Sequence, residues 1–192
     1  MKAKNDPSTT ALYRHLKAHY RVMLAEHDGS LWATNSYWLV RLDGEQGVFG
    51  KLLAEYNLPF EPMVCEVGRT LMRTGQDPPN VGALVPDSLN GYGTVERFTI
   101  GGAPLSTEKK DTEAELWVRS DDSRLVTLDR RWREFVTTYS AGSAWSHGGD
   151  TRRPLVYHDD GQVHALVMPV LHLLTEDTFA PGAKPAAKKK AA

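Results

Sequence analysis

The sequence predicts an α+β fold built mainly on antiparallel sheet, with helices that bury one face against it. Apolar residues recur with a helical period in three segments, and short apolar runs of strand character separate these segments. Asp-Gly dipeptides, which favour tight hairpins, stand between several of the runs. With 192 residues, of which 41% are hydrophobic and 24% charged, the chain has the composition of a globular protein.

The first helix is expected at 11–21, where Leu12, Leu16 and Tyr20 recur at four-residue spacing. Ser8 or Thr9 is suited to cap it, because a hydroxyl accepts a hydrogen bond from a free backbone N–H of the first turn. The polar residues 1–10 are otherwise expected to be flexible.

Short strands and one more helix follow, with a hairpin signal at Asp28-Gly29, while Asp43-Gly44 ends the third strand. Leu52 and Leu53 mark the buried face of the second helix, and Pro59 lies beyond its end. The expected strands are 22–27, 30–35, 37–42, 63–67 and 70–73, and the expected helix is 48–56.

The segment 75–93 is rich in Pro and Gly and is expected to be a linker or long loop. Beyond it, a third helix and a final hairpin around Asp160-Gly161 are expected. The strands are expected at 95–100, 113–120, 123–127, 155–158 and 162–168, and the helix at 128–139.

These elements predict two compact units, 11–76 and 94–174, joined by a linker at 77–93. From residue 175 to 192 the sequence becomes an Ala/Lys/Pro tail with little to bury, so the tail is expected to be disordered.

Positive charge is concentrated on two of the expected helices and on the tail. The formal net charge is -1, but without the four tail lysines the chain has 19 basic and 24 acidic residues, a charge of -5. At 100° per residue, the basic residues of each helix lie opposite an apolar stripe, with Arg131 on the flank. The clusters are Arg14, Lys17 and Arg21, then Arg130, Arg131 and Arg133, and in the tail Lys184, Lys188, Lys189 and Lys190.

Exposed helix faces often carry Lys and Arg simply because these residues favour helices. Two nearly all-basic faces on an acidic chain instead favour contact with the phosphates of double-stranded DNA, without sequence specificity and weakened by salt.

The titratable residues suggest no catalytic site. His158, Asp159, Asp160, His164 and His172 could suggest a metal cluster, but Asp-Asp-Gly is typical of a turn. His158 and His164 would face each other across the hairpin. Ser146 and His147 are adjacent and rarely form a nucleophile–base pair. We expect no enzyme, metal or cofactor; an enzyme using the His158/His164 hairpin remains an alternative.

The single cysteine, Cys65, excludes an internal disulfide. A reducing, cytoplasmic location is the natural expectation. No charged-then-apolar leader opens the chain, and no apolar run approaches the ~20 residues of a membrane helix.

Two parts of the sequence resemble bacterial β sliding clamps. Residues 29–39 read Gly-Ser-Leu-Trp-Ala-Thr-Asn-Ser-Tyr-Trp-Leu and resemble a clamp strand that reads roughly l-x-l-x-A-T-D-x-x-R-L. Residues 125–136 resemble the last strand-to-helix segment, and 153–157 with 165–170 resemble the closing "kPvl…yvvMPm" strands. The resemblance covers about a third of the chain.

The sequence also departs from this family. Asn35 replaces an Asp, Trp38 stands where an Arg is common, and residues 43–112 match no motif. The chain is about half as long as a three-domain bacterial clamp. This small size resembles that of a phage or mobile-element version of the clamp.

The resemblance implies a DNA-clamp-like fold, with antiparallel sheets outside and helices packed on one face. It also implies an apolar groove for short peptides of partner proteins. By position, the groove residues are Thr34, Tyr37, Trp38, Leu39, Val167, Met168, Pro169 and Val170. An adaptable Met and aromatic walls suit such a groove, although Trp38, Leu39 and Val167 would equally suit a buried core.

We therefore expect a processivity factor that forms a homo-oligomeric ring around duplex DNA and tethers a DNA polymerase. Two domains per chain favour a trimer, and one domain would favour a larger ring. The alternative is a clamp-fold regulator or decoy that binds replication proteins without encircling DNA.

Overall fold

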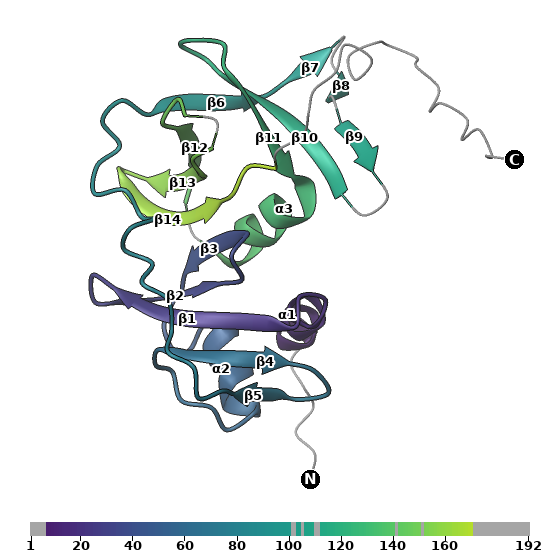
Figure 1. Cartoon of the computed structure of the whole chain (residues 1–192), viewed down its shortest axis with the longest axis vertical. Helices are drawn as coiled ribbons and strands as arrows, with labels where there is room; N and C mark the ends of the chain where they lie inside the picture. The colour runs from purple at the N-terminus through teal and green to yellow at the C-terminus, as the bar shows by residue number, and fades with distance from the viewer. Residues whose placement is uncertain are drawn as a thin grey trace, which may run out of the picture.

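The computed structural model describes residues 7–100, 103–104, 106–109, 112–140, 142–150 and 152–170. These residues form three helices and fourteen strands, which confirms the α+β class (Figure 1). The N-terminal elements are α1 (Pro7–Lys17), β1 (Arg21–His27), β2 (Ser30–Thr34), β3 (Trp38–Arg41), α2 (Val48–Glu55), β4 (Met63–Val67) and β5 (Leu71–Arg73). The remaining elements are β6 (Gly93–Arg97), β7 (Thr99–Ile100), β8 (Ala103–Pro104), β9 (Ser106–Lys109), β10 (Thr112–Arg119), β11 (Leu125–Asp129), α3 (Arg130–Tyr139), β12 (Ala144–His147), β13 (Leu155–Asp159) and β14 (Gln162–Val167).

Twelve of the strands form one large sheet whose neighbours are all antiparallel. Its order is β11-β10-β6-β12-β13-β14-β3-β2-β1-β4-β5, with β9 beside β10. The pairing of β3 with β14 joins its two halves, and there Leu39 lies opposite Leu166. Two segments far apart in the sequence therefore become neighbours.

Both predicted Asp-Gly hairpins are confirmed. Asp28 and Gly29 have φ angles of 49° and 66°, and Asp160 and Gly161 have φ angles of 45° and 78°. Two consecutive positive φ values define the type I′ turn, whose twist matches that of the strands it joins. These turns fix the registers of β1–β2 and β13–β14.

All three helices pack on one face of the sheet, as their shared core shows (Figure 1). Leu12 and Leu16 of α1, Leu52 of α2, and Phe135 and Val136 of α3 belong to one buried cluster with inward-facing strand residues. We call this cluster the helix-side core.

The opposite face is covered by residues 74–92, which we call the strap. Val81 of the strap is 1% exposed and belongs to a second core with Trp32, Leu39 and Val156. The segment expected to be a linker or long loop is thus a loop that packs closely on the sheet. The division into two clamp-like units stays a prediction.

The first helix begins and ends four residues earlier than expected. Residues 7–10, expected to be flexible, lie within it, so neither Ser8 nor Thr9 is the capping residue that precedes the helix. It begins at Pro7, whose fixed φ angle suits a helix start. It ends before Tyr20, which has a φ angle of 60° and is 76% exposed. The helix closes before Tyr20, with the Ala18 and His19 N–H groups donating to the carbonyls of His15 and Leu16. Tyr20 is therefore not part of the buried stripe that its spacing predicted.

The third helix begins two residues later than expected, because Leu128 and Asp129 complete β11. The Asp129 side chain accepts a hydrogen bond from the Arg131 N–H at 2.9 Å and caps the helix. Strand β12 was not predicted at all.

No helix in the described part of the chain is long and apolar enough to cross a membrane. Cys65 is buried in β4, and burial raises the pKa of its thiol to about 11. The thiol is therefore a packing group of the helix-side core.

Candidate functional site

A small hydrophobic hollow, which we call the apolar pocket, lies where β2, β3 and β14 meet the strap. Its volume is about 20 Å³, a little more than one water molecule requires. It can therefore receive the end of one side chain. Its lining residues are Thr34, Ser36, Trp38, Leu39, Leu84, Leu166 and Met168.

Local hydrogen bonds hold the β2–β3 turn beside this pocket. The Thr34 hydroxyl donates to the Trp38 carbonyl at 2.6 Å and accepts from the Ser36 N–H at 3.1 Å. The Asn35 side-chain oxygen accepts from the Tyr37 N–H, and the Met168 N–H donates to the Tyr37 carbonyl at 2.8 Å. The turn is thus tied both to itself and to the residue that follows β14.

Four of the eight predicted groove residues line the apolar pocket: Thr34, Trp38, Leu39 and Met168. The other four do not. Tyr37 points to another contact, Val167 is fully buried in the helix-side core, and Pro169 and Val170 do not line the pocket. The Val170 N–H instead donates to the Thr127 carbonyl at 2.8 Å.

Three lining residues were not predicted: Ser36, Leu84 and Leu166. Leu166 and Met168 are two residues apart, so strand alternation could have placed Leu166 beside Met168. Leu84 comes from the strap, and nothing in the sequence connects it with β14. Its side chain is 46% exposed, which makes it one of the few large apolar residues at the surface of the described chain.

Tyr37 lies against α3 rather than in the pocket. Its ring is parallel to that of Trp132, with centroids 5.3 Å apart and an angle of 2°. His19 packs on the same indole at 4.2 Å, and His15 stacks on Phe135 at 3.9 Å. Burial, together with the charge of nearby Arg131, lowers the pKa of both histidines.

The predicted basic face of α1 is present in part. Arg14 and Lys17 are exposed on the helix. Arg21 is not on this face, because it belongs to β1, where Val22 faces the helix side and side chains alternate. It therefore points to the strap side, and its Nη2 donates to the Gln76 side-chain oxygen at 2.9 Å.

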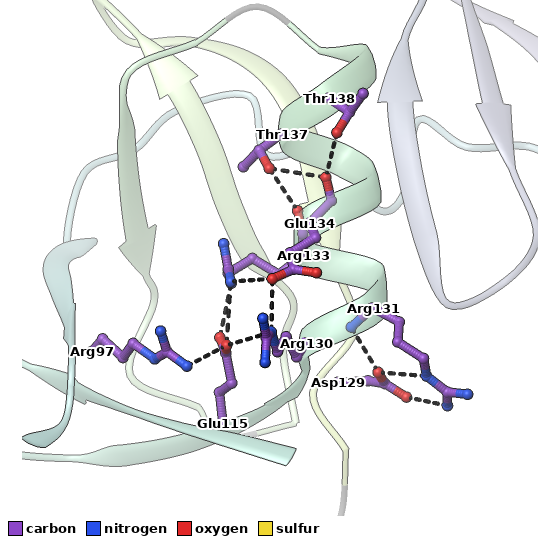
Figure 2. A network of polar contacts seen from close by, with 9 residues as sticks. All are labelled: Arg97, Glu115, Asp129, Arg130, Arg131, Arg133, Glu134, Thr137 and Thr138. Carbon is purple, nitrogen blue, oxygen red and sulfur yellow. Dashed lines mark hydrogen bonds and ion pairs between the residues drawn. The ribbon is translucent and has the colours of Figure 1, made fainter. Parts of the chain in front are cut away.

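The arginines of α3 are held by carboxylates. Figure 2 shows Arg97, Arg130 and Arg133 around Glu115, which is fully buried. The shortest nitrogen–oxygen distances from Glu115 are 2.6 Å to Arg97, 2.8 Å to Arg133 and 3.9 Å to Arg130. Arg133 is only 18% exposed. It is a partner of a buried charge rather than an outward-facing phosphate ligand, contrary to the expectation from its helical position.

Arg130 and Arg131 are more exposed but also engaged. Arg130 lies 2.7 Å from the Glu134 carboxylate, a pair one helical turn apart. Arg131 binds both carboxylate oxygens of Asp129, at 3.1 and 2.7 Å (Figure 2). The four tail lysines lie outside the described residues.

The two histidines of the final hairpin are not paired in register. His158 lies opposite Val163, and the register shift between Tyr157 and His158 leaves His164 at the irregular position. Burial, then the charge of Arg41 and to a smaller extent His158, lowers the pKa of His164. The described residues contain no group of three or more His, Cys, Asp or Glu able to hold a metal ion. His172 lies outside them.

His158 instead forms a hydrogen bond with Ser146, with 2.8 Å between Nε2 and Oγ. Such a pair becomes a nucleophile and base when a third group orients the imidazole. Within the described residues, His158 Nδ1 is buried without a partner. This arrangement supports no catalytic triad.

No family model, curated protein or solved structure matches this chain.

Proposed function

We propose that this protein is a sliding-clamp-like docking protein. Its apolar pocket anchors one apolar side chain of a short peptide from a DNA polymerase or another replication protein. The observation that carries the proposal is that two short segments, 34–39 and 166–168, contribute most of the pocket lining: Thr34, Ser36, Trp38, Leu39, Leu166 and Met168. These are the segments whose sequences resemble the peptide groove of bacterial clamps.

The pocket has the physical properties that an anchor site requires. Trp38 and Leu39 are 1% and 2% exposed and provide a rigid base. Leu84 and Met168 are more accessible, and a Met side chain adapts to differently shaped partners. Because the hydrogen-bonded turn is already ordered, little conformational entropy is lost on binding.

The test is the affinity of a fluorescently labelled C-terminal peptide of the replicative polymerase, measured by anisotropy. Leu84→Ala and Met168→Ala each remove apolar contact, and we expect each to weaken binding about tenfold, or about 1.4 kcal/mol. Met72→Ala is the matched control, since Met72 is 57% exposed on β5 outside the pocket. Unchanged affinity in both pocket variants, with thermal unfolding preserved, would contradict the proposal.

A second candidate function is a cytoplasmic homo-oligomeric ring, a trimer in the favoured form, around duplex DNA. The observation favouring it is the exposed pair Arg14 and Lys17 on the helix-covered face. Such point charges would give weak, salt-sensitive phosphate contacts compatible with sliding.

The ring is tested by light scattering and by retention on circular DNA. We expect an oligomer, and we expect Arg14→Glu with Lys17→Glu to reduce retention, whereas Arg152→Glu, another exposed arginine, leaves it unchanged. Variants of Arg133 are unsuitable, because they would uncover the buried Glu115. A strict monomer that still binds the peptide would favour a regulator or decoy that does not encircle DNA.

A further inference from the structure

A second pocket, which we call the arginine pocket, opens on the strap side of the sheet. Its volume is about 170 Å³, large enough for a small organic molecule. Four parts of the chain form it: the β1–β2 hairpin, β3, the strap and the β13–β14 hairpin. The polar side chains among its walls include His27, Ser30, Arg41 and Gln162.

Arg41 differs from the other half-buried arginines of the described chain. Arg97 and Arg133 pair with Glu115, and Arg119 pairs with Asp121 at 2.6 Å. Arg41 has no carboxylate within ion-pair distance among the described residues, and its Nε donates to the neutral Ser30 hydroxyl at 3.0 Å.

This pairing leaves the two terminal nitrogens of Arg41 available for a ligand. A guanidinium is always charged, and a partly buried charge is costly unless an opposite charge accompanies it. Its planar fork fits a carboxylate through two parallel hydrogen bonds. The pocket is therefore suited to a ligand that carries a carboxylate.

Carboxylates at the rim narrow the class of ligand. Asp28 and Asp87 both line the pocket and are exposed, and Asp28 lies 3.5 Å from His27 Nε2. These two carboxylates repel a multiply charged anion such as phosphate, and they attract an ammonium group. A ligand with one negative and one positive group satisfies both Arg41 and the rim.

The remaining wall is apolar. Trp32 is 3% exposed and Val163 is 8% exposed, and both line the pocket with Val85 of the strap. This wall is suited to an aliphatic side chain.

We propose that the arginine pocket binds a small zwitterion of the amino-acid class. The carboxylate binds Arg41, the ammonium faces Asp28 and Asp87, and an aliphatic side chain packs on Trp32 and Val163. This binding is independent of peptide docking at the apolar pocket.

The test is a titration of the ¹⁵N-labelled full chain, following the Trp32 indole N–H and the Arg41 Nε–H by NMR. L-Leucine is expected to shift both signals to saturation. N-Acetyl-L-leucine lacks the ammonium and L-leucinamide lacks the carboxylate, so each is expected to bind at least tenfold more weakly. Equal binding of either analogue, a response to inorganic phosphate alone, or no saturable shift would overturn the proposal.

Two sets of variants assign the contacts. Arg41→Gln is expected to abolish saturable binding, whereas Arg69→Gln, an exposed arginine outside the pocket, leaves it unchanged. Asp28→Asn with Asp87→Asn changes only exposed side chains and keeps the fold. This double variant is expected to weaken L-leucine binding but not N-acetyl-L-leucine binding, because only L-leucine carries the ammonium group that faces the two carboxylates. Unchanged L-leucine affinity in either the Arg41 or the double Asp variant would contradict the assignment.

Discussion

At the scale of single residues, Glu115 is the most constrained charge of the described chain. It is fully buried in β10, and its carboxylate joins Arg97 of β6 to Arg133 of α3 (Figure 2). A buried ion pair adds little net stability over an apolar pair, but removing one partner leaves an uncompensated charge. The network therefore fixes where α3 sits on the sheet.

Glu115→Gln is expected to lower the free energy of unfolding by about 3–5 kcal/mol, because guanidinium groups lose their carboxylate. Glu134→Gln is the control, since that side chain is 49% exposed. Replacing the exposed Glu134 carboxylate is expected to lower the free energy of unfolding by less than about 1 kcal/mol. Urea unfolding measures both values, and similar stabilities of the two variants would show that the buried network does not hold α3.

His15 makes stability depend on pH. Burial, and then the charges of His19 and Arg131, lower its pKa from 6.5 to about 4. The unfolded chain therefore takes up a proton near pH 6.5, and the folded chain does so only near pH 4. The stability that neutral His15 contributes is complete above pH 6.5 and is lost as the pH falls towards 4.

The variant His15→Gln is expected to weaken this loss of stability. One such group changes the free energy of unfolding by at most about 1.4 kcal/mol per pH unit. Unfolding midpoints between pH 4 and 7 measure the effect for both proteins. If stability falls with pH in the same way for the variant and the unmodified chain, then His15 is not the source of the pH dependence.

At the scale of elements, helix ends were less predictable than helix faces. The stripe of Leu12 and Leu16 was predicted and is buried, but the same spacing extended the helix to Tyr20. The left-handed conformation of Tyr20 ends the stripe, and Tyr has no intrinsic preference for it. Composition alone therefore could not locate this end.

The strap is the element that the sequence described least well. Its Pro and Gly content indicated a loop, but its packing depends on Val81, Val85 and Leu89 meeting Trp32 and neighbouring strand residues. Such contacts between distant segments leave no periodic signal in the strap itself.

Val81→Ala is expected to loosen the strap, because a buried side chain loses about two CH₂-sized groups at about 0.8 kcal/mol each. Limited proteolysis between residues 82 and 91 should become faster. Leu84→Ala is the control, since Leu84 is largely exposed and contributes less to strap packing. Equal cleavage of both variants and the unmodified chain would contradict the role of Val81.

At the scale of the whole molecule, the sequence predicted the α+β class and four of the seven residues that line the apolar pocket. The resemblance placed Thr34, residues 37–39 and residues 167–170 in one groove, and the pairing of β3 with β14 brings Trp38 and Leu39 beside Val167 and Leu166. It could not supply Leu84, which reaches the pocket only because the strap crosses the sheet. Helical spacing likewise could not show that Arg133 pairs with the buried carboxylate of Glu115, because spacing within α3 does not reveal a partner on β10.

The proposal that a partner peptide docks in the apolar pocket can be tested at the Met168 side chain itself. The most direct measurement is a titration of the chain, with ¹³C-labelled Met methyl groups, with the polymerase C-terminal peptide. Met168 lines the pocket, whereas Met72 is exposed elsewhere. We expect a saturable shift of the Met168 methyl signal, whereas the Met72 methyl signal stays unchanged. Peptide binding that leaves the Met168 signal in place would contradict it.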